Sequence, residues 1–496
     1  MLTTLTAPAF AGTWYIEDGD ITISAGESGN NVTQNNNTTY GDTNTIITNQ
    51  NKDTASSHTV TIEAKDKDDK VEVTLKDVNI DTSSRNKAAV SVTGEGDTNI
   101  KLDGDNALKS DIYRSGIYGS GSGSLTISGG ENDSLTAQGG SGANGISSSG
   151  SLTISGGTVT ANGDDGGRGI SSSGSVTISG GSTVTANGGS GTISGGDGIC
   201  SSGGVTISGG STVTANGGNG GSLVGGDGIR SDGGVTISGG TVKAAGGDSK
   251  DGYGGDGIRS GGGVTISGNT VNAAGGNGGK VGGYGICSFD RVAISGGTVE
   301  AAGGNGSTGG GSGIYSSVID LSGSLELTAK AGSPNGKALS QKGSELVLDT
   351  IKDKLGPGAK VTATDADGKV IDQVSTPRPV EPEESSSSSD GGSAAPSAPA
   401  SPLPGLTVTD KDGQRISYTS TQSGNTLTVC VGRLTASFRI SLAALRQLRA
   451  EGIETIAFQT VLCSTTLSVD ELLAMGGENA EAVLTHRFTD SSLTVG

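Results

Sequence analysis

Residues 198–218 read Gly198-Ile-Cys-Ser-Ser-Gly-Gly-Val-Thr-Ile-Ser-Gly-Gly-Ser-Thr-Val-Thr-Ala-Asn-Gly-Gly218, and close variants recur along the middle of this 496-residue chain. The Gly-Ile pair that opens each unit returns every 24 to 30 residues. Its isoleucines are Ile117, Ile146, Ile170, Ile199, Ile229, Ile258, Ile286 and Ile314. A repeat of this length is typical of solenoids, in which each unit buries its apolar face against the next.

The intervals inside each unit indicate where strands and corners lie. In the six units that open at residues 146 to 286, an apolar anchor follows the isoleucine after eight residues, and a valine follows after five or six more. Apolar and hydroxyl residues alternate around these anchors, as in Leu152-Thr-Ile-Ser155, and such alternation predicts strands. All the length variation falls in the 11 to 16 residues between the valine and the next isoleucine. The third corner should therefore carry a loop of variable length.

These observations predict an all-β fold, a right-handed parallel β-helix with three strands in each rung of 24–30 residues. With the degraded units before and after the clear repeats, residues 12–374 should form about 11–13 rungs. Trp14 and Tyr15 are candidate caps for one end of the core, and glycine, 92 of 496 residues, is expected at corners that need a positive φ. A content of 31% hydrophobic residues and a net charge of −19 also suit a disordered tract. Disorder, however, gives no reason for an apolar spacing kept through six successive units.

The two ends of the chain differ from the repeats. Residues 1–11 close with Ala9-Phe10-Ala11, which predicts the remnant of a secretory signal, with an ordinary mobile terminus as the alternative. Residues 375–404 are rich in proline and serine and predict a linker. Residues 405–496 predict a small α+β domain, with strands at 406–408, 426–431 and 454–458 and helices at 441–451 and 469–475. No stretch approaches 18 apolar residues, so no membrane span is expected. The expected location is extracellular or at the cell surface.

The four cysteines predict at most one disulfide. Cys200 and Cys287 share a repeat position three rungs apart, about 14 Å at ~4.8 Å per rung, which exceeds the reach of a disulfide. Both should be free thiols. Cys430 and Cys463 both lie in the predicted C-terminal domain and could pair, and the sequence leaves this open.

A family resemblance rests on residues 71–140. This segment contains Val71-Glu-Val-Thr-Leu-Lys-Asp-Val-Asn-Ile80, Ala88-Ala-Val-Ser-Val92 and Asn99-Ile-Lys-Leu-Asp-Gly-Asp-Asn-Ala-Leu-Lys-Ser110, and Gly-Ile and Leu-Thr-Ile-Ser-Gly-Gly units follow. The chain, over about residues 60 to 330, resembles the repeat-rich "carbohydrate-binding domain-containing" surface proteins of gut Firmicutes. The resemblance implies a β-helical architecture, export and an adhesive role, but it transfers no residue motif. Residues 403–407, Leu-Pro-Gly-Leu-Thr, depart from the Leu-Pro-x-Thr-Gly sorting signal.

The variable corners should stack along one edge, where three aspartates recur in Gly-Gly-Asp-Gly-Ile: Asp197, Asp227 and Asp256. Tyr284 takes the next equivalent position. Carboxylates at ~4.8 Å spacing repel each other, and a calcium ion is one remedy. The simpler alternative, which we favour, is that each aspartate bonds the backbone of its own turn and stays solvated. The calcium signature Gly-Gly-x-Gly-x-Asp is not met, because cysteine and arginine occupy its aspartate position.

A glycan site needs aromatic platforms beside hydrogen-bonding groups. Aromatics make up only 3% of the chain, so the sequence favours the alternative that these are incidental surface tyrosines. The candidate residues near the loop edge are Tyr253, Tyr284, Phe289, Tyr315, Arg230 and Arg259.

An enzyme is the competing class. A polysaccharide lyase or hydrolase would use Arg230 and Arg259 with the flanking Asp227, Asp232 and Asp256, yet near-identical repeats offer no single asymmetric pocket. The two histidines lie in different domains, which argues against histidine triads and zinc sites, and a pI near 4.5 argues against nucleic acid as a partner. We therefore predict a structural and adhesive solenoid, not an enzyme, with glycans as the candidate ligand and no obligatory cofactor.

Overall fold

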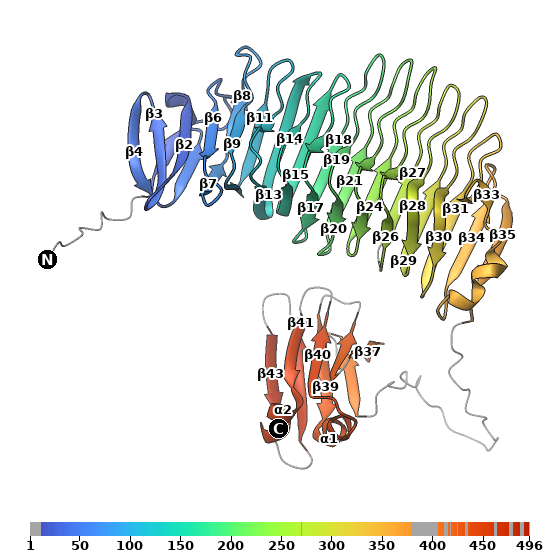
Figure 1. Cartoon of the computed structure of the whole chain (residues 1–496). Helices are drawn as coiled ribbons and strands as arrows, with labels where there is room; N and C mark the ends of the chain where they lie inside the picture. The colour runs from blue at the N-terminus through green and yellow to red at the C-terminus, as the bar shows by residue number, and fades with distance from the viewer. Residues whose placement is uncertain are drawn as a thin grey trace, which may run out of the picture. The chain divides into compact units, whose positions relative to one another are not determined.

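The computed structural model describes residues 11–377 apart from 269, and residues 405–495 with gaps at 411–414, 417, 424, 432–434, 461–463, 476–479 and 487–490. The chain divides into two compact units, Met1–Glu383 and Glu384–Gly496, and each is considered by itself (Figure 1). Residues 1–10 of the expected signal remnant and residues 378–404 of the expected linker lie outside the described residues.

The first unit is an all-β solenoid of about 13 turns, built from stacked parallel strands, which confirms the predicted fold class. The first strands of successive rungs are β12 (Ile117–Gly119), β14 (Ile146–Ser148), β16 (Ile170–Ser172), β19 (Ile199–Ser201), β22 (Ile229–Ser231), β25 (Ile258–Ser260), the start of β28 (Ile286–Ile294) and β30 (Ile314–Leu321). The second strands lie in β13 (Leu125–Ser141), β15 (Leu152–Asp164), β17 (Val176–Ser179), β20 (Val205–Ile207), β23 (Val235–Ile237), β26 (Val264–Ile266), β28 and β30. The third strands lie in β13, β15, β18 (Thr183–Asn187), β21 (Thr212–Asn216), β24 (Thr241–Ala245), β27 (Thr270–Ala274), β29 (Gly297–Ala302) and β31 (Leu325–Lys330).

The anchor residues stack in register, each directly over its equivalent, and register shifts such as that between Ser288 and Arg291 fall between the anchors. Ile199 pairs with Ile229 and Ile229 with Ile258, and the same register continues along the clear repeats. All eight anchor isoleucines are fully buried. Burial of each such side chain contributes about 1.5–3 kcal/mol, and a one-residue slip would expose the whole column. The apolar spacing in the sequence therefore determines the register.

Both ends of the solenoid carry additional elements. The N-terminal part contains β1 (Thr13–Tyr15), a 3-10 turn (Ile16–Asp18), β2 (Ile21–Gly26), β3 (Gly29–Gln34), β4 (Asn37–Asp42), β5 (Thr45–Thr48), β6 (Val60–Ala64), β7 (Lys70–Lys76), β8 (Asn79–Asp81), β9 (Val90–Gly94), β10 (Asp97–Asp103) and β11 (Asp105–Lys109). The C-terminal part contains β32 (Leu339–Gln341), β33 (Ser344–Glu345), a 3-10 helix (Leu348–Lys354), β34 (Lys360–Thr364) and β35 (Val370–Ser375).

Trp14 packs against the core and donates from Nε1 to Asp42 at 2.9 Å, whereas Tyr15 is 40% exposed. Antiparallel strands β3 and β4 extend the sheet at this end, so the expected Trp-Tyr cap is only partly right.

The third corner is not a simple loop. From the rung of Ile199 onward it forms two glycine-rich arms, which Figure 1 shows as a row of arches along one edge. The amide of Gly218 donates to Gly196 at 2.8 Å, and the amide of Gly226 donates to Gly218 at 2.8 Å, so the arms of successive rungs are bonded in a zigzag. A Cβ on Gly226 would lie 1.9 Å from the oxygen of Gly196, although Gly226 has no positive φ. Glycine is therefore required here for close approach; the expected positive φ applies at tight corners such as Gly209 (φ 64°).

The C-terminal unit has two four-stranded sheets and two helices. One sheet contains β36 (Leu406–Thr409), β39 (Ala436–Ser441), β42 (Glu481–His486) and β43 (Ser491–Val495); the other contains β37 (Thr419–Ser423), β38 (Thr426–Cys430), β40 (Thr455–Gln459) and β41 (Ser464–Ser468). The helices are α1 (Leu442–Ala450) and α2 (Val469–Met475). Each strand and helix predicted here is present, and the Ser441 hydroxyl caps α1 by accepting from the amide of Ala444 at 3.2 Å. Cys430 is a free thiol, and Cys463 lies outside the described residues.

Neither helix of the described chain is long and apolar enough to cross a membrane. Cys200 and Cys287 are free thiols, as the three-rung separation predicts.

Candidate functional site: a polar groove along the loop edge

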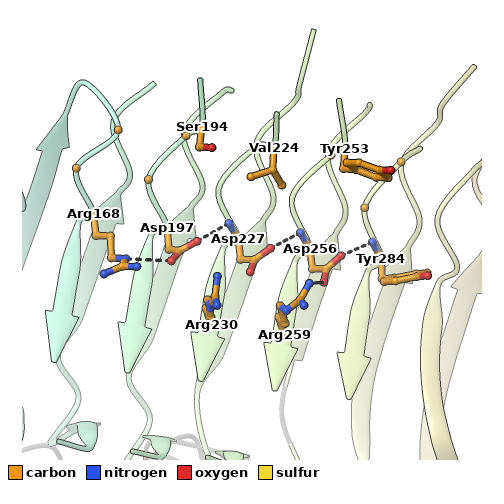
Figure 2. A pocket seen from close by; sticks show the side chains of 18 of the residues that line it. Arg168, Ser194, Asp197, Val224, Asp227, Arg230, Tyr253, Asp256, Arg259 and Tyr284 are labelled. Atoms are coloured by element: carbon orange, nitrogen blue, oxygen red, sulfur yellow. Dashed lines mark hydrogen bonds and ion pairs between the residues drawn. The ribbon is translucent and has the colours of Figure 1, made fainter. Parts of the chain in front are cut away.

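A groove of about 820 Å³ runs along the edge where the third corner returns to the first strand. Its lining comes from successive rungs, between Gly142 and Tyr284. The residues that precede each Gly-Ile pair form a central row, flanked on one side by the returning glycine arms and on the other by the first strands (Figure 2). The repeat thus produces one long shallow feature, because each rung adds the same three elements at the same place.

The central row is a ladder of side-chain to backbone hydrogen bonds between rungs. Oδ1 of Asp197 accepts from the amide of Asp227 at 2.9 Å, and Oδ1 of Asp227 accepts from the amide of Asp256 at 2.7 Å. Oδ1 of Asp256 accepts from the amide of Tyr284 at 2.8 Å. The three aspartates are only 4–6% exposed. The expectation that each one bonds its own turn and stays solvated is therefore wrong: the amide that it reaches belongs to the next rung.

Burial changes the acid-base properties of this row. Burial, followed by the charges of Asp256 and Asp197, raises the pKa of Asp227 well above its ordinary value. Burial also raises the pKa of Asp256, to about 6, even though the amide of Tyr284 and the guanidinium of Arg259 favour its charged form. Asp227 and Asp256 therefore hold their protons nearer to neutral pH than free aspartates do.

Two arginines neutralise two of the three carboxylates. Arg168 contacts Asp197 at 3.1 Å and Arg259 contacts Asp256 at 3.3 Å. Within the described chain, Asp227 forms no ion pair, and neither does the exposed Arg230. Arg230 and Asp227 both line the groove, so the groove contains one cation with no bonded partner beside a carboxyl of raised pKa.

The middle residues of the first strands form a column on the side away from the core, which we call the front column; of its members Cys287 is buried. It consists of the middle residues of the Ile-x-Ser or equivalent strands, each paired in register with the next: Tyr118, Ser147, Ser171, Cys200, Arg230, Arg259, Cys287 and Tyr315. Within these eight rungs tyrosines occupy the first and last positions and arginines the centre, and the register continues to Ser91 before Tyr118 and to Ser340 after Tyr315.

The predicted aromatic residues gather at one end of the groove. Tyr253 is 51% exposed and lies on the wall opposite Arg230 and Arg259. Tyr284 lines the groove and stacks on Tyr315, with ring centroids 4.9 Å apart and planes at 19°. Phe289, 56% exposed, holds the Arg259 guanidinium 5.4 Å from its ring centroid. All six residues predicted as glycan candidates thus line the groove or contact a residue that does.

The groove wall that faces the front column was not predicted from the sequence, apart from Tyr253. Ser194, Val224, Tyr253 and Val281 lie one above another, joined by isolated parallel bridges, and all four line the groove. Each of them precedes the central-row residue of its rung by three positions. The constant three-residue offset was the sequence signal that could have predicted this wall. Asn144 and Arg168, at the first two positions of the central row, could likewise have been found by their spacing from the Gly-Ile pairs.

The calcium alternative finds no support in the donor geometry. In the described part of the chain no group of three or more His, Cys, Asp or Glu side chains is placed to hold a metal ion. Oδ1 of each aspartate accepts an amide, and Oδ2 of two of them faces an arginine. Asp232, which the lyase hypothesis included, is exposed and does not line the groove.

Compared with known proteins, the chain matches no family model, no curated protein and no solved structure.

Proposed function

We propose that the chain is a structural and adhesive β-solenoid of the cell exterior that binds glycans along its groove. The observation that carries the proposal is the groove itself, because it combines aromatic faces, hydrogen-bonding groups and arginines in one elongated depression. Sugars present apolar ring faces and hydroxyls together, and aromatic rings with polar neighbours complement both.

Export is the second part of the proposal. The Ala9-Phe10-Ala11 triplet, the proline- and serine-rich segment at 375–404 and the resemblance to repeat-rich surface proteins support it. A solenoid suits a role outside the cell, because it displays the same edge over many rungs and holds it rigidly.

Cleavage of an acidic polysaccharide is the second candidate, favoured by one observation. Carboxyls with raised pKa in a groove are typical of acid-base catalysts, and Asp227 and Asp256 fit that description. We place binding first because Oδ1 of both carboxyls accepts a backbone amide, and Asp256 also pairs with Arg259. These contacts support the stacking of rungs and leave little freedom for proton transfer.

A glycan array with the whole chain tests the proposal, with Tyr253→Val as the groove variant. Valine is already present at the equivalent wall position as Val224 and Val281, so the substitution should leave the fold intact. Tyr40→Val is the matched control, because Tyr40 is 73% exposed and lies on β4, outside the groove. Binding that Y253V weakens and Y40V preserves is the expected result.

Two results would contradict the proposal. An array without binding to any glycan removes the lectin function and leaves a scaffold. Release of unsaturated or reducing ends from the bound polysaccharide by the wild type, abolished in Asp227→Asn, would establish cleavage in place of simple binding.

A further inference from the structure

The groove extends beyond the four rungs that carry the aspartates and arginines. A second depression of about 240 Å³ is lined by Tyr113, Tyr118 and neighbouring residues, and it shares Gly142 and Asn144 with the first. The two depressions are therefore continuous. The front column that borders them spans seven rung intervals from Tyr118 to Tyr315, about 34 Å at ~4.8 Å per rung. Such a length suits a linear polymer that lies parallel to the solenoid axis.

Aromatic rings lie at both ends of this path. At one end Tyr113 is 78% exposed and Tyr118 is 44% exposed. At the other end Tyr253 lies on the wall, and the stacked pair of Tyr284 and Tyr315 closes the row. Ring faces therefore lie at both ends of the path, with Arg114 beside the first pair of tyrosines and three further arginines at the centre.

The charge balance at the centre of the groove indicates the sign of the ligand's charge. Arg168 and Arg259 are paired with Asp197 and Asp256. Arg230 has no ion pair in the described chain, and Asp227, which lines the groove in the same rung, resists ionisation because it is buried. An exposed guanidinium of this kind binds a carboxylate through two parallel hydrogen bonds, which Lys cannot reproduce.

We propose that the ligand is a linear uronate-containing glycan that lies along the front column, with one carboxylate on Arg230 and sugar rings on the terminal tyrosines. This inference rests on the proposed glycan binding and adds its chemical class and direction. The whole chain is acidic, with a net charge of −19, so the attraction is local to the groove and should weaken with salt.

The repeat itself supplies the variants for a test. Arg230→Ser places at this position the residue found at positions 147 and 171 of the front column. Arg230→Lys keeps the charge and removes the planar fork. Lys243→Thr is the matched control, because Lys243 is exposed on β24, outside the groove, and pairs in register with Thr214.

Binding is measured by calorimetry on the whole chain, with oligomers of galacturonate, glucuronate and mannuronate and with their methyl esters. The esters preserve the sugar and the linkage and remove only the charge. At least one acid oligomer should bind about tenfold more tightly than its ester. R230S should abolish this difference, R230K should restore only part of it, and K243T should leave it unchanged.

Oligomer length tests the direction of binding. Affinity should increase with length until the oligomer spans the path from Arg230 to Tyr118. Tyr118→Ser, which introduces the residue of the next rung, should weaken only the longer oligomers.

Each contrary outcome has a distinct meaning. Equal affinity for acids and esters, or no binding of any acid oligomer, overturns the uronate inference while glycan binding on the array would still stand. Equal binding of poly-glutamate overturns it in favour of an acidic peptide. Failure of every glycan on the array overturns both the inference and the proposed function.

Discussion

The buried carboxylate of Asp256 makes the solenoid's stability depend on pH in a direction opposite to that of most aspartates. Its pKa is raised from 3.8 to about 6 by burial. A group whose pKa is higher in the folded state contributes stability that is fully present below pH 3.8 and is lost as the pH rises through 6. Asp256→Asn should therefore stabilise the solenoid at pH 7.5, since asparagine resembles the protonated acid at every pH.

The expected magnitude follows from the size of the shift. The difference between 6 and 3.8 is about two pKa units, which corresponds to on the order of 3 kcal/mol at 1.36 kcal/mol per unit. The pKa already contains the attraction of Arg259, so this is a net value. The geometry favours the change as well, because Asn144 performs the same role and accepts the amide of Arg168 at 2.8 Å.

Thermal unfolding monitored by circular dichroism at pH 7.5 and pH 4 is the assay. With an unfolding entropy of about 2 cal/mol/K per residue, 3 kcal/mol in a cooperative unit of this size raises Tm by about 4 °C. The gain should be present at pH 7.5 and absent at pH 4, where the wild-type carboxyl is protonated.

Asp248→Asn is the matched control for this experiment. Oδ1 of Asp248 also accepts the amide of the next rung, from Asn277 at 2.6 Å, but Asp248 is exposed. In the ladder of side-chain to amide bonds that contains Asp248, Asn219 and Asn277 accept the next rung's amide in the same way. Asp248→Asn should therefore change stability by less than about 0.5 kcal/mol at either pH. A lower Tm for D256N at pH 7.5, or an equal gain at both pH values, would refute the argument from burial.

Three further predictions concern the glycine arms and the C-terminal unit. Gly226→Ala should destabilise the solenoid by about 1–3 kcal/mol or more, since its Cβ would lie 1.9 Å from the oxygen of Gly196; Gly309→Ala, with nothing nearer than 3.8 Å, should have little effect on Tm. Burial lowers the pKa of His486, so the C-terminal unit should lose stability as the pH falls below about 6.5. Hydrogen-exchange protection of residues 405–495 should therefore decrease at pH 5, and unchanged protection at that pH would contradict the prediction. Ser441→Ala removes the cap of α1 and should lower the free energy of unfolding by about 0.5–2 kcal/mol, measured by urea unfolding followed through the helix signal. Ser441→Asp, which can still cap the helix, should retain most of the wild-type stability.

Much of the fold follows from the sequence, for a physical reason. Apolar anchors at constant spacing can be buried only if every rung places them over one another, so the spacing that carries Ile199 and Ile229 predicts both the strands and their register. Local signals sufficed also for α1, because a capping serine and a following glycine act over a few residues. The positions of the candidate aromatic and arginine residues on one edge follow from the same periodicity.

The chemistry of the groove was decided by tertiary structure. The sequence shows that Asp227 recurs at an equivalent position, but not that the amide within reach belongs to Asp256 of the next rung, nor that the carboxyl is buried. Contact across rungs and exclusion of water depend on what lies one strand spacing away. The glycine arms illustrate the same limit, because Gly226 is required by the oxygen of Gly196, thirty residues earlier in the chain. Periodicity along the sequence thus determined the scaffold, while the proximity of rungs in space determined which side chains are buried, paired or left available to a ligand.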